Sequence, residues 1–159
     1  MTWTAIPADE VCDLIEFWRD APWPMTTTQT NERAAQLGWT VEDEDFLVNE
    51  VSGLSNTDVD TSTMPSGDLA GLTFGTTDVI GDPDAKAQGF LDDQFTLVVR
   101  AGTQRWGKPR MQRTKAGGQA AQWDLADDGA RVIVLRTASG VLADFTTPQY
   151  ARVLRGLGQ

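Results

Sequence analysis

The first apolar stripe along the chain predicts a helix close to residue 1. Pro7 followed by the acids Asp9 and Glu10 begins a helix well, because proline suits the first turn and carboxylates there stabilise the positive end of the helix dipole. Four apolar residues then recur at the i, i+3, i+4, i+7 spacing of one buried helix face: Val11, Leu14, Ile15 and Trp18. We therefore expect a helix from about Ala8 to Arg19.

A second helix is expected after a short break. The segment Ala21-Pro22-Trp23-Pro24 cannot continue the first helix, because proline lacks a backbone N–H and clashes with the preceding turn. Threonines at positions 26 to 28 supply an N-cap, and Gly38 ends the pattern that runs through residues 33–37. The first part of the chain is therefore expected to form a helix pair.

From Trp39 onward the period of the apolar residues changes from helical to alternating. Trp39, Val41, Phe46 and Val48 alternate with polar neighbours, as in half-exposed strands. The acids at positions 42 to 45 repel one another and are poor strand formers, so we expect them at the tip of a hairpin. Residues 52–68 are rich in turn-forming residues, which predicts a long surface loop. Alternation returns over residues 69–79, which predicts another strand.

The second half of the chain predicts a long helix and then a basic loop. Asp82-Pro83-Asp84 is a strong helix start, and the apolar stripe after it predicts a helix over residues 83–104. The segment 106–118 is basic and contains glycines, so we expect a loop there.

The last part of the chain predicts an antiparallel meander and a terminal helix. Strands are expected over residues 121–125, 131–136 and 140–145, because good turn residues separate these apolar runs. Thr147-Pro148 then begins a helix. Its expected inward face is Tyr150, Val153, Leu154 and Leu157.

These elements predict a single α+β domain over residues 1–159. The order is helix, helix, strands, helix, strands, helix, which indicates an antiparallel sheet covered mainly on one face. We expect about five to six strands packed with about four helices. A chain of 159 residues lies within the usual size of one domain, and its 40% hydrophobic content is sufficient for a core.

Charge is unevenly distributed along the chain. Residues 1–99 hold 19 acids and three bases, a net charge of −16, whereas residues 100–159 hold four acids and ten bases, a net of +6. A total of −10 repels nucleic acid and anionic membranes and speeds encounter with a basic partner. We therefore expect no nucleic-acid or membrane binding, and we interpret the basic segment from Arg105 to Lys115 as a solvated loop that offsets acidic surface.

The cysteine content and the apolar runs of the chain indicate where in the cell the protein is located. Cys12 is the only cysteine, so no internal disulfide or zinc cluster of cysteines is possible. The first residues show no signal-peptide pattern, and the longest apolar runs are far below the roughly 18 residues of a membrane span. A cytoplasmic location is expected.

The usual groups of enzyme chemistry are sparse. The chain has no histidine, the commonest proton shuttle and metal ligand, and Cys12 therefore has no histidine to take its proton. Asp58-Val59-Asp60-Thr61 matches a phosphatase-like and a calcium-loop pattern, but it lacks the apolar strand before it and the glutamate after it that these sites need. We predict no catalytic, cofactor-binding or metal-binding residues. A mechanism with two carboxylates stays open as an alternative.

The acidic run beside aromatic residues is the strongest candidate for partner binding. Carboxylates steer a basic protein surface toward the site, and aromatic rings anchor it by filling pockets. The alternative is a solvated hairpin tip beside core aromatics. The candidate residues, with two acids from the expected loop, are Trp39, Glu42, Asp43, Glu44, Asp45, Phe46, Asp58 and Asp60.

Several packing residues resemble those of a known group of proteins. They are the first helix ending near Trp18, Trp23-Pro24, Leu37-Gly38-Trp39, and the stretch from Trp123-Asp124 through Val132-Ile133-Val134-Leu135 to the terminal helix. In these the chain resembles small proteins of high-GC Gram-positive bacteria that look like immunity proteins of polymorphic toxin systems. The resemblance transfers no site residues. It implies an acidic, cytoplasmic, bacterial protein that binds and blocks a cognate basic toxin domain.

Three functions follow from these observations. The first is an immunity protein or inhibitor that covers a basic toxin with the acidic part of the chain. The second is a secretion chaperone or adaptor that holds an apolar export segment and depends little on salt. The third is a carboxylate-based enzyme, for which paired acids with raised pKa values would be the sign. The identity of the toxin and whether the protein is a monomer or a dimer stay open.

Overall fold

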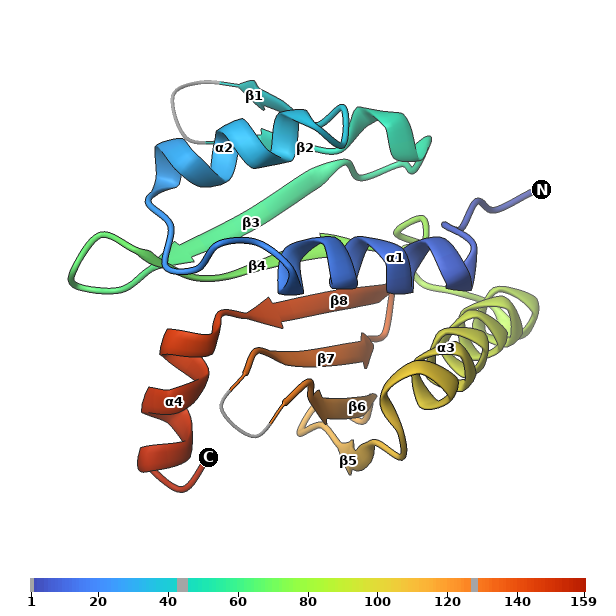
Figure 1. Ribbon diagram of the computed structural model, residues 1–159. Helices are drawn as coiled ribbons and strands as arrows, with labels where there is room; N and C mark the ends of the chain where they lie inside the picture. The colour runs from blue at the N-terminus through green and yellow to red at the C-terminus, as the bar shows by residue number, and fades with distance from the viewer. Residues whose placement is uncertain (1, 43–45, 127–128) are drawn as a thin grey trace.

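The computed structural model describes residues 2–42, 46–126 and 129–159 of the chain (Figure 1). Over these residues the chain forms four α-helices, one short 3-10 helix and eight strands. The helices are α1 (Ala8–Arg19), α2 (Thr27–Ala35), α3 (Ala85–Trp106), α4 (Pro148–Gly156) and the 3-10 helix η1 (Glu50–Ser52). The strands are β1 (Thr40–Glu42), β2 (Phe46–Val48), β3 (Asp58–Thr63), β4 (Leu69–Gly75), β5 (Arg110–Arg113), β6 (Gln119–Asp124), β7 (Arg131–Arg136) and β8 (Val141–Thr146).

The strands form one antiparallel sheet in the order β1-β2-β3-β4-β8-β7-β6-β5. Each half of the chain supplies a four-stranded meander, and the two meanders join where β4 pairs with β8, from Gly71 opposite Thr146 to Gly75 opposite Leu142. The helix α3 connects the halves, so β1 and β5 become the two outer edges of the sheet (Figure 1).

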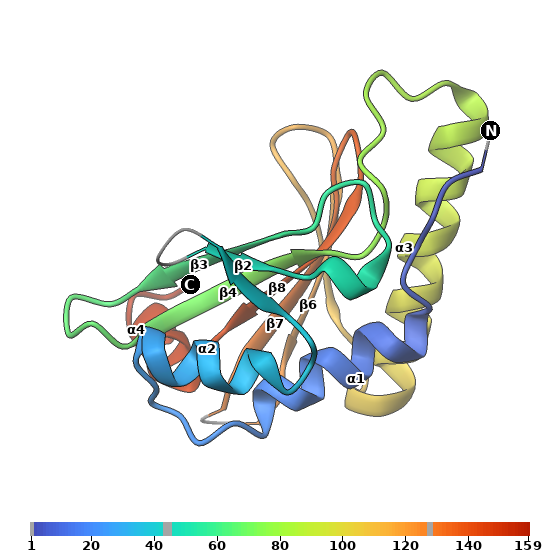
Figure 2. The same ribbon diagram turned by 90° about the horizontal axis from the view of Figure 1, so that it is seen from above.

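Helices α1, α2 and α3 cover one face of this sheet (Figure 2). Aromatic contacts tie the sheet to this layer: Trp23, between α1 and α2, stacks on Phe145 of β8 with ring centroids 5.8 Å apart, and Trp106 of α3 meets Trp123 of β6 edge-on at 5.4 Å. Trp18 of α1 is fully buried among these helices and the sheet. The core therefore draws on residues from across the whole sequence.

The helix ends follow capping rules. The Thr26 hydroxyl accepts a hydrogen bond from the Gln29 N–H, while the Gln29 side chain accepts one from the Thr26 N–H, which makes a capping box before α2. Asp84 caps α3 by accepting from the Ala87 N–H at 2.8 Å. The helix α1 begins at Ala8 and ends at Arg19, as the apolar stripe predicts.

The sequence underestimates the number of strands, and the expected order therefore lacks two of them. Residues 52–68, predicted as a loop, contain β3, and residues 106–118, also predicted as a loop, contain β5. In β3 only Val59 is buried, and the other residues of the strand have short polar side chains. All four residues of β5 are exposed at a sheet edge. Neither strand therefore carries the apolar alternation that identifies a strand in sequence.

The predicted inward face of α4 is wrong at three of its four residues. Tyr150, Val153 and Leu157 are exposed, Leu154 is partly buried, and Ala151 is the buried residue of this helix. The helix is held by polar contacts instead: Arg155 donates to Asp124 Oδ1 at 3.0 Å and to the Gly129 carbonyl at 3.0 Å. Among the described helices, none has the length and apolar character that crossing a membrane requires.

Candidate functional site

The structure brings four of the predicted partner-binding residues to one face of the sheet. Val41, Leu47 and Val59 stand opposite one another on β1, β2 and β3. Leu47 and Val59 are buried on the helix-covered side, and Val41 lies on the same side at the edge of the sheet, where it is 44% exposed. Their neighbours along each strand point to the other face, because side chains alternate along a strand. These neighbours include Glu42, Phe46, Asp58 and Asp60. We call the surface that these four residues form the acidic face. Phe46 is 43% exposed there.

Trp39 does not belong to this face. Its side chain is only 3% exposed and lies in the core, with its ring centroid 5.6 Å from that of Trp18 and 5.8 Å from that of Phe74. The prediction that Trp39 and Phe46 flank the acids on one surface is therefore wrong, because the two rings lie on opposite sides of the sheet. Asp43, Glu44 and Asp45 lie outside the described residues.

The described acids of the acidic face have no cationic partner. Within the described ranges, no ion pair reaches Glu42, Asp58 or Asp60, whereas some other carboxylates are paired: Asp92 with Arg136 at 2.9 Å and Asp124 with Arg131 at 3.0 Å. The negative charge of β1 and β3 is therefore not neutralised by a neighbouring cation, and its carboxylates are exposed to solvent.

The basic segment is divided between two roles. Arg105 at the end of α3 reaches α1, where its Nη1 lies 2.8 Å from Asp13 Oδ1 and 3.4 Å from Glu16 Oε1. The hydrogen bond with Asp13 raises the pKa of Arg105 above its usual value. Arg110 and Arg113 instead lie exposed on β5, at the edge of the sheet opposite β1. Charge asymmetry along the sequence thus becomes charge asymmetry across the sheet.

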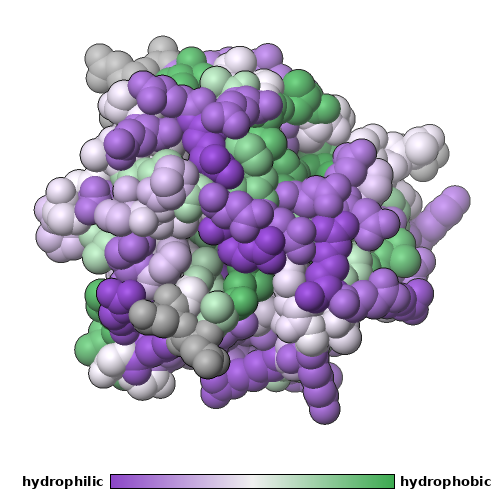
Figure 3. Space-filling model, in the orientation of Figure 1, coloured by the Kyte–Doolittle hydropathy of each residue, from purple (hydrophilic) through white to green (hydrophobic). Residues whose placement is uncertain are grey.

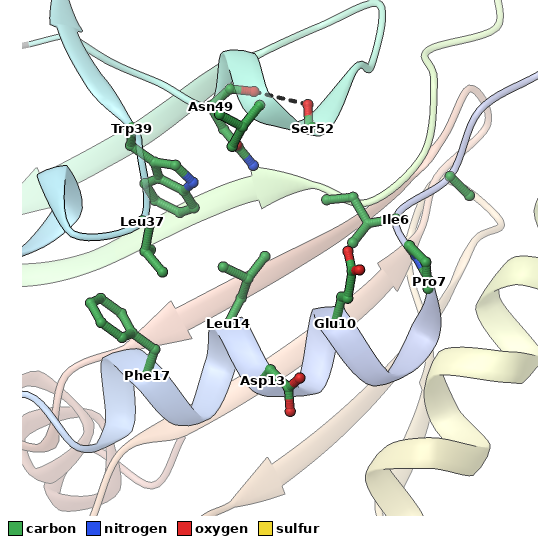
Figure 4. Close-up of a pocket in the computed structure, with 12 residues that line it drawn as sticks. Ile6, Pro7, Glu10, Asp13, Leu14, Phe17, Leu37, Trp39, Asn49 and Ser52 are labelled. Carbon is green, nitrogen blue, oxygen red and sulfur yellow. Dashed lines mark hydrogen bonds between the residues drawn. The ribbon is translucent and has the colours of Figure 1, made fainter.

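A second candidate site is a pocket of about 410 Å³ on the helix-covered side, between α1, the residues before it, and the turn around η1 (Figure 4). We call it the α1 pocket. An apolar surface is visible between α1, α2 and η1 in the space-filling view (Figure 3). The lining residues are Ala5, Ile6, Pro7, Glu10, Asp13, Leu14, Phe17, Leu37, Trp39, Asn49, Val51 and Ser52.

Local sequence features shape the walls of this pocket. Helical spacing places Leu14 and Phe17 on one side of α1, where both stay half-buried. The opposite wall depends on Gly38, whose φ of +78° is a left-handed conformation that glycine adopts without strain. A Cβ atom at Gly38 would lie 3.3 Å from Val51 Cγ1, so the turn before β1 and the turn at η1 approach closely.

The two acids of the pocket point in different directions. Figure 4 shows the Glu10 carboxylate directed toward the cavity, whereas the Asp13 carboxylate points away from it. Asp13 is the group that binds Arg105. Across the described part of the chain, no ion pair involves Glu10, so its negative charge stands at the cavity without a counterion.

Asn49 is an unusual polar group in the pocket wall. It stands at the N-cap position of η1, yet its side chain makes no capping hydrogen bond. The residue is only 5% exposed, and its Oδ1 atom is buried without a hydrogen-bond partner. Its backbone is fixed, because the Asn49 N–H donates to the Thr57 carbonyl at 2.8 Å and the Ser52 hydroxyl donates to the Asn49 carbonyl at 2.9 Å.

The remaining titratable groups of interest lie elsewhere. Burial raises the pKa of the Cys12 thiol to about 11, with Arg105 acting in the opposite direction, so the thiol is protonated at neutral pH. Burial also raises the pKa of Asp144 on β8, against the lowering effect of a hydrogen bond with Thr73. The residues directly opposite Asp144 are Thr73 and Ile133. Among the residues with described positions, no group of three His, Cys, Asp or Glu side chains is arranged to hold a metal ion.

Sequence patterns identify part of the acidic face but not the pocket. The stripe Val11, Leu14, Ile15, Trp18 indicates which side of α1 is buried, but it does not show that Leu14 stops short of full burial. Phe17 beside that stripe is the one available signal, because it widens the apolar side of α1 beyond what the core covers. Asn49 carries no sequence signal.

By its fold the protein is of the α+β class, with helices on one face of an antiparallel sheet. The chain belongs to a family of unknown function, DUF6301, whose model matches residues 9–147. It matches no curated protein and no solved structure. The description of the family names no activity and no toxin system, so the resemblance to immunity proteins stays a hypothesis.

Proposed function

We propose that this protein is a binding inhibitor, an immunity protein that neutralises a cognate basic toxin domain by means of the acidic face. The observation that carries the proposal is the set of uncompensated carboxylates Glu42, Asp58 and Asp60 beside the exposed ring of Phe46. Charged groups of this kind accelerate the encounter with an oppositely charged surface, and a neighbouring aromatic residue supplies apolar contact.

The charge asymmetry of the sheet supports a defined orientation of the partner. The acidic face lies on β1, β2 and β3, while Arg110 and Arg113 lie on β5 at the far edge. A basic partner is therefore attracted to one end of the molecule and repelled from the other. Electrostatic complementarity of this kind determines how the partner is oriented on the surface as well as how fast it associates.

The experiment first seeks a gene beside that of this protein whose product ends in a short basic domain, and then measures binding to that domain. Association and dissociation rates are recorded by surface plasmon resonance at several NaCl concentrations. We expect a nanomolar or tighter complex whose association rate falls as salt rises. The double variant Asp58→Lys/Asp60→Lys is expected to slow association by about tenfold or more at low salt.

The matched control is Glu32→Lys/Asp93→Lys, which changes the net charge equally at exposed acids on α2 and α3. It should retain most of the association rate. Absence of a complex, or equal losses in both double variants, would count against the proposal, because neither outcome assigns a role to the acidic face.

The second candidate function is an adaptor or secretion chaperone that binds an export segment. The α1 pocket favours it, because apolar side chains dominate its lining. Binding through apolar contact depends little on salt. A complex whose association rate stays constant across the NaCl series would therefore support the adaptor and contradict the acidic-face inhibitor.

A further inference from the structure

The α1 pocket has the size and lining of a site that receives a bulky apolar group. Its volume of about 410 Å³ falls within the range of roughly 300–1,000 Å³ that ligand pockets occupy. Leu14, Phe17 and Leu37 stay only partly buried around it, and Val51 at its edge is 68% exposed. This apolar surface gains from being covered.

The polar groups of the pocket restrict what can bind there. Glu10 offers a carboxylate without a counterion, and Figure 4 shows the amide nitrogen of Asn49 directed toward the cavity. The carboxylate accepts hydrogen bonds and is negatively charged, whereas the amide nitrogen donates them. An anionic ligand would be repelled by Glu10, whereas a cation carried on an apolar body satisfies the carboxylate while its apolar part covers the walls.

We propose that the α1 pocket is an anchor site for a partner polypeptide: it takes an apolar side chain, and a Lys or Arg next to that side chain pairs with Glu10. The inference rests on the protein-binding function proposed above and names a second contact with the same basic partner. The acidic face governs encounter, and the α1 pocket holds one side chain in place.

The first test uses small probes and needs no toxin. 1-Naphthylmethylammonium and 1-naphthylacetate share one aromatic body and differ in charge. Their affinities are measured by isothermal titration calorimetry, and their position is measured by NMR shifts of the Leu14 and Val51 methyl groups. We expect the ammonium probe to bind in the pocket and to lose about two- to fivefold in affinity in Glu10→Gln.

The control variant is Glu32→Gln, which removes an exposed carboxylate of α2 outside this pocket. This variant shows how much affinity the ammonium probe loses when any one surface carboxylate is removed. It should leave the preference of the pocket for the ammonium probe over the acetate probe intact. Equal affinity losses in Glu10→Gln and Glu32→Gln would overturn the proposal. Methyl shifts that map elsewhere would overturn it as well.

Two variants test the pocket by filling it. Leu14→Trp adds bulk from α1, and Val51→Trp adds bulk from an exposed position, so that at least one is expected to fold. Thermal unfolding identifies the folded variant. Such a variant should bind the ammonium probe at least about fivefold more weakly. Unchanged probe binding in a folded variant would overturn the proposal.

The two proposals fail in different ways. Loss of toxin binding in Asp58→Lys/Asp60→Lys with full toxin affinity in Leu14→Trp and Val51→Trp would retain the inhibitor function and reject the pocket as its anchor site. Probe binding in the pocket without any complex with the basic domain would reject the inhibitor function, and with it the assignment of the pocket to that partner.

Discussion

At the scale of single residues, Gly102 marks the tightest contact between α3 and the sheet. A Cβ atom at this position would lie 2.9 Å from Trp123 Cζ2 and 3.1 Å from Trp106 Cζ3, closer than side chains tolerate. We expect Gly102→Ala to lower the free energy of unfolding by about 1–3 kcal/mol, because the two indole rings must move. Urea unfolding monitored by tryptophan fluorescence measures the change.

Gly89 provides a matched control in the same helix, since a Cβ atom there would meet nothing within 4 Å. Gly89→Ala should stabilise the protein by about 0.5–1 kcal/mol through helix propensity alone. Stabilisation by both substitutions would show that the packing of α3 against Trp123 is looser than described.

The carboxyl group of Asp144 is expected to make the stability of the fold depend on pH. Burial raises the pKa of Asp144 in the folded state above its unfolded value, so its stabilising contribution is present below the unfolded pKa and is lost as pH rises through the folded pKa. At neutral pH the buried charge is a cost. We therefore expect Asp144→Asn to raise Tm by about 2–4 °C at pH 7 and to give no advantage near pH 3.

Calorimetry of wild type, Asp144→Asn and the exposed-site variant Asp93→Asn across this pH range checks the prediction. Asp93→Asn reports what removing one negative charge does by itself. An advantage of Asp144→Asn that persists unchanged at low pH would contradict the assignment of the effect to a buried charge.

At the scale of elements, α2 depends strongly on its cap. Thr30 and Ala34 are the buried residues of this short, polar helix, so few packing contacts hold it. Thr26→Ala removes the hydroxyl of the capping box, and we expect a loss of about 1 kcal/mol. The loss should be visible as faster amide hydrogen exchange in α2 before the rest of the molecule is affected. Thr28→Ala, an exposed threonine within α2, should have a smaller effect.

Elements were predictable from sequence wherever one residue pattern is enough to define them. The stripe of α1 and the apolar runs of β6, β7 and β8 give nearly correct bounds. Strands β3 and β5 were missed because their exposed polar side chains leave no alternation, and pairing with β4 and β6 holds them in place. The terminal helix was found, but its buried face was not, because ion pairs with Asp124 position it.

For the candidate sites, too, the sequence indicates the residues of one segment but not which segments the fold brings together. The acids of β1 and β3 are visible in the sequence, but their shared direction depends on register across three strands. Trp39 was misplaced because alternation indicates two faces without saying which is covered. The α1 pocket combines α1 with Leu37 and with Asn49, residues that only the tertiary fold brings together.

At the scale of the whole molecule, the sheet is a single unit built from two halves of unequal charge. Residues 1–81 hold 15 acids and two bases, a net charge of −13, and residues 82–159 hold eight acids and 11 bases, a net of +3. The halves meet along β4 and β8, through Trp23 against Phe145, and through Arg105 against α1. Each half alone exposes one side of these contacts.

We therefore expect the fragments 1–81 and 82–159 to be unfolded or loosely collapsed when separate and to form the native sheet when mixed. Near-UV circular dichroism detects the fixed tryptophan environments that should appear only in the mixture. Opposite net charges should speed association at low salt and slow it as salt is added. Cooperative unfolding of either fragment alone would contradict this, because that half would then possess a complete core of its own.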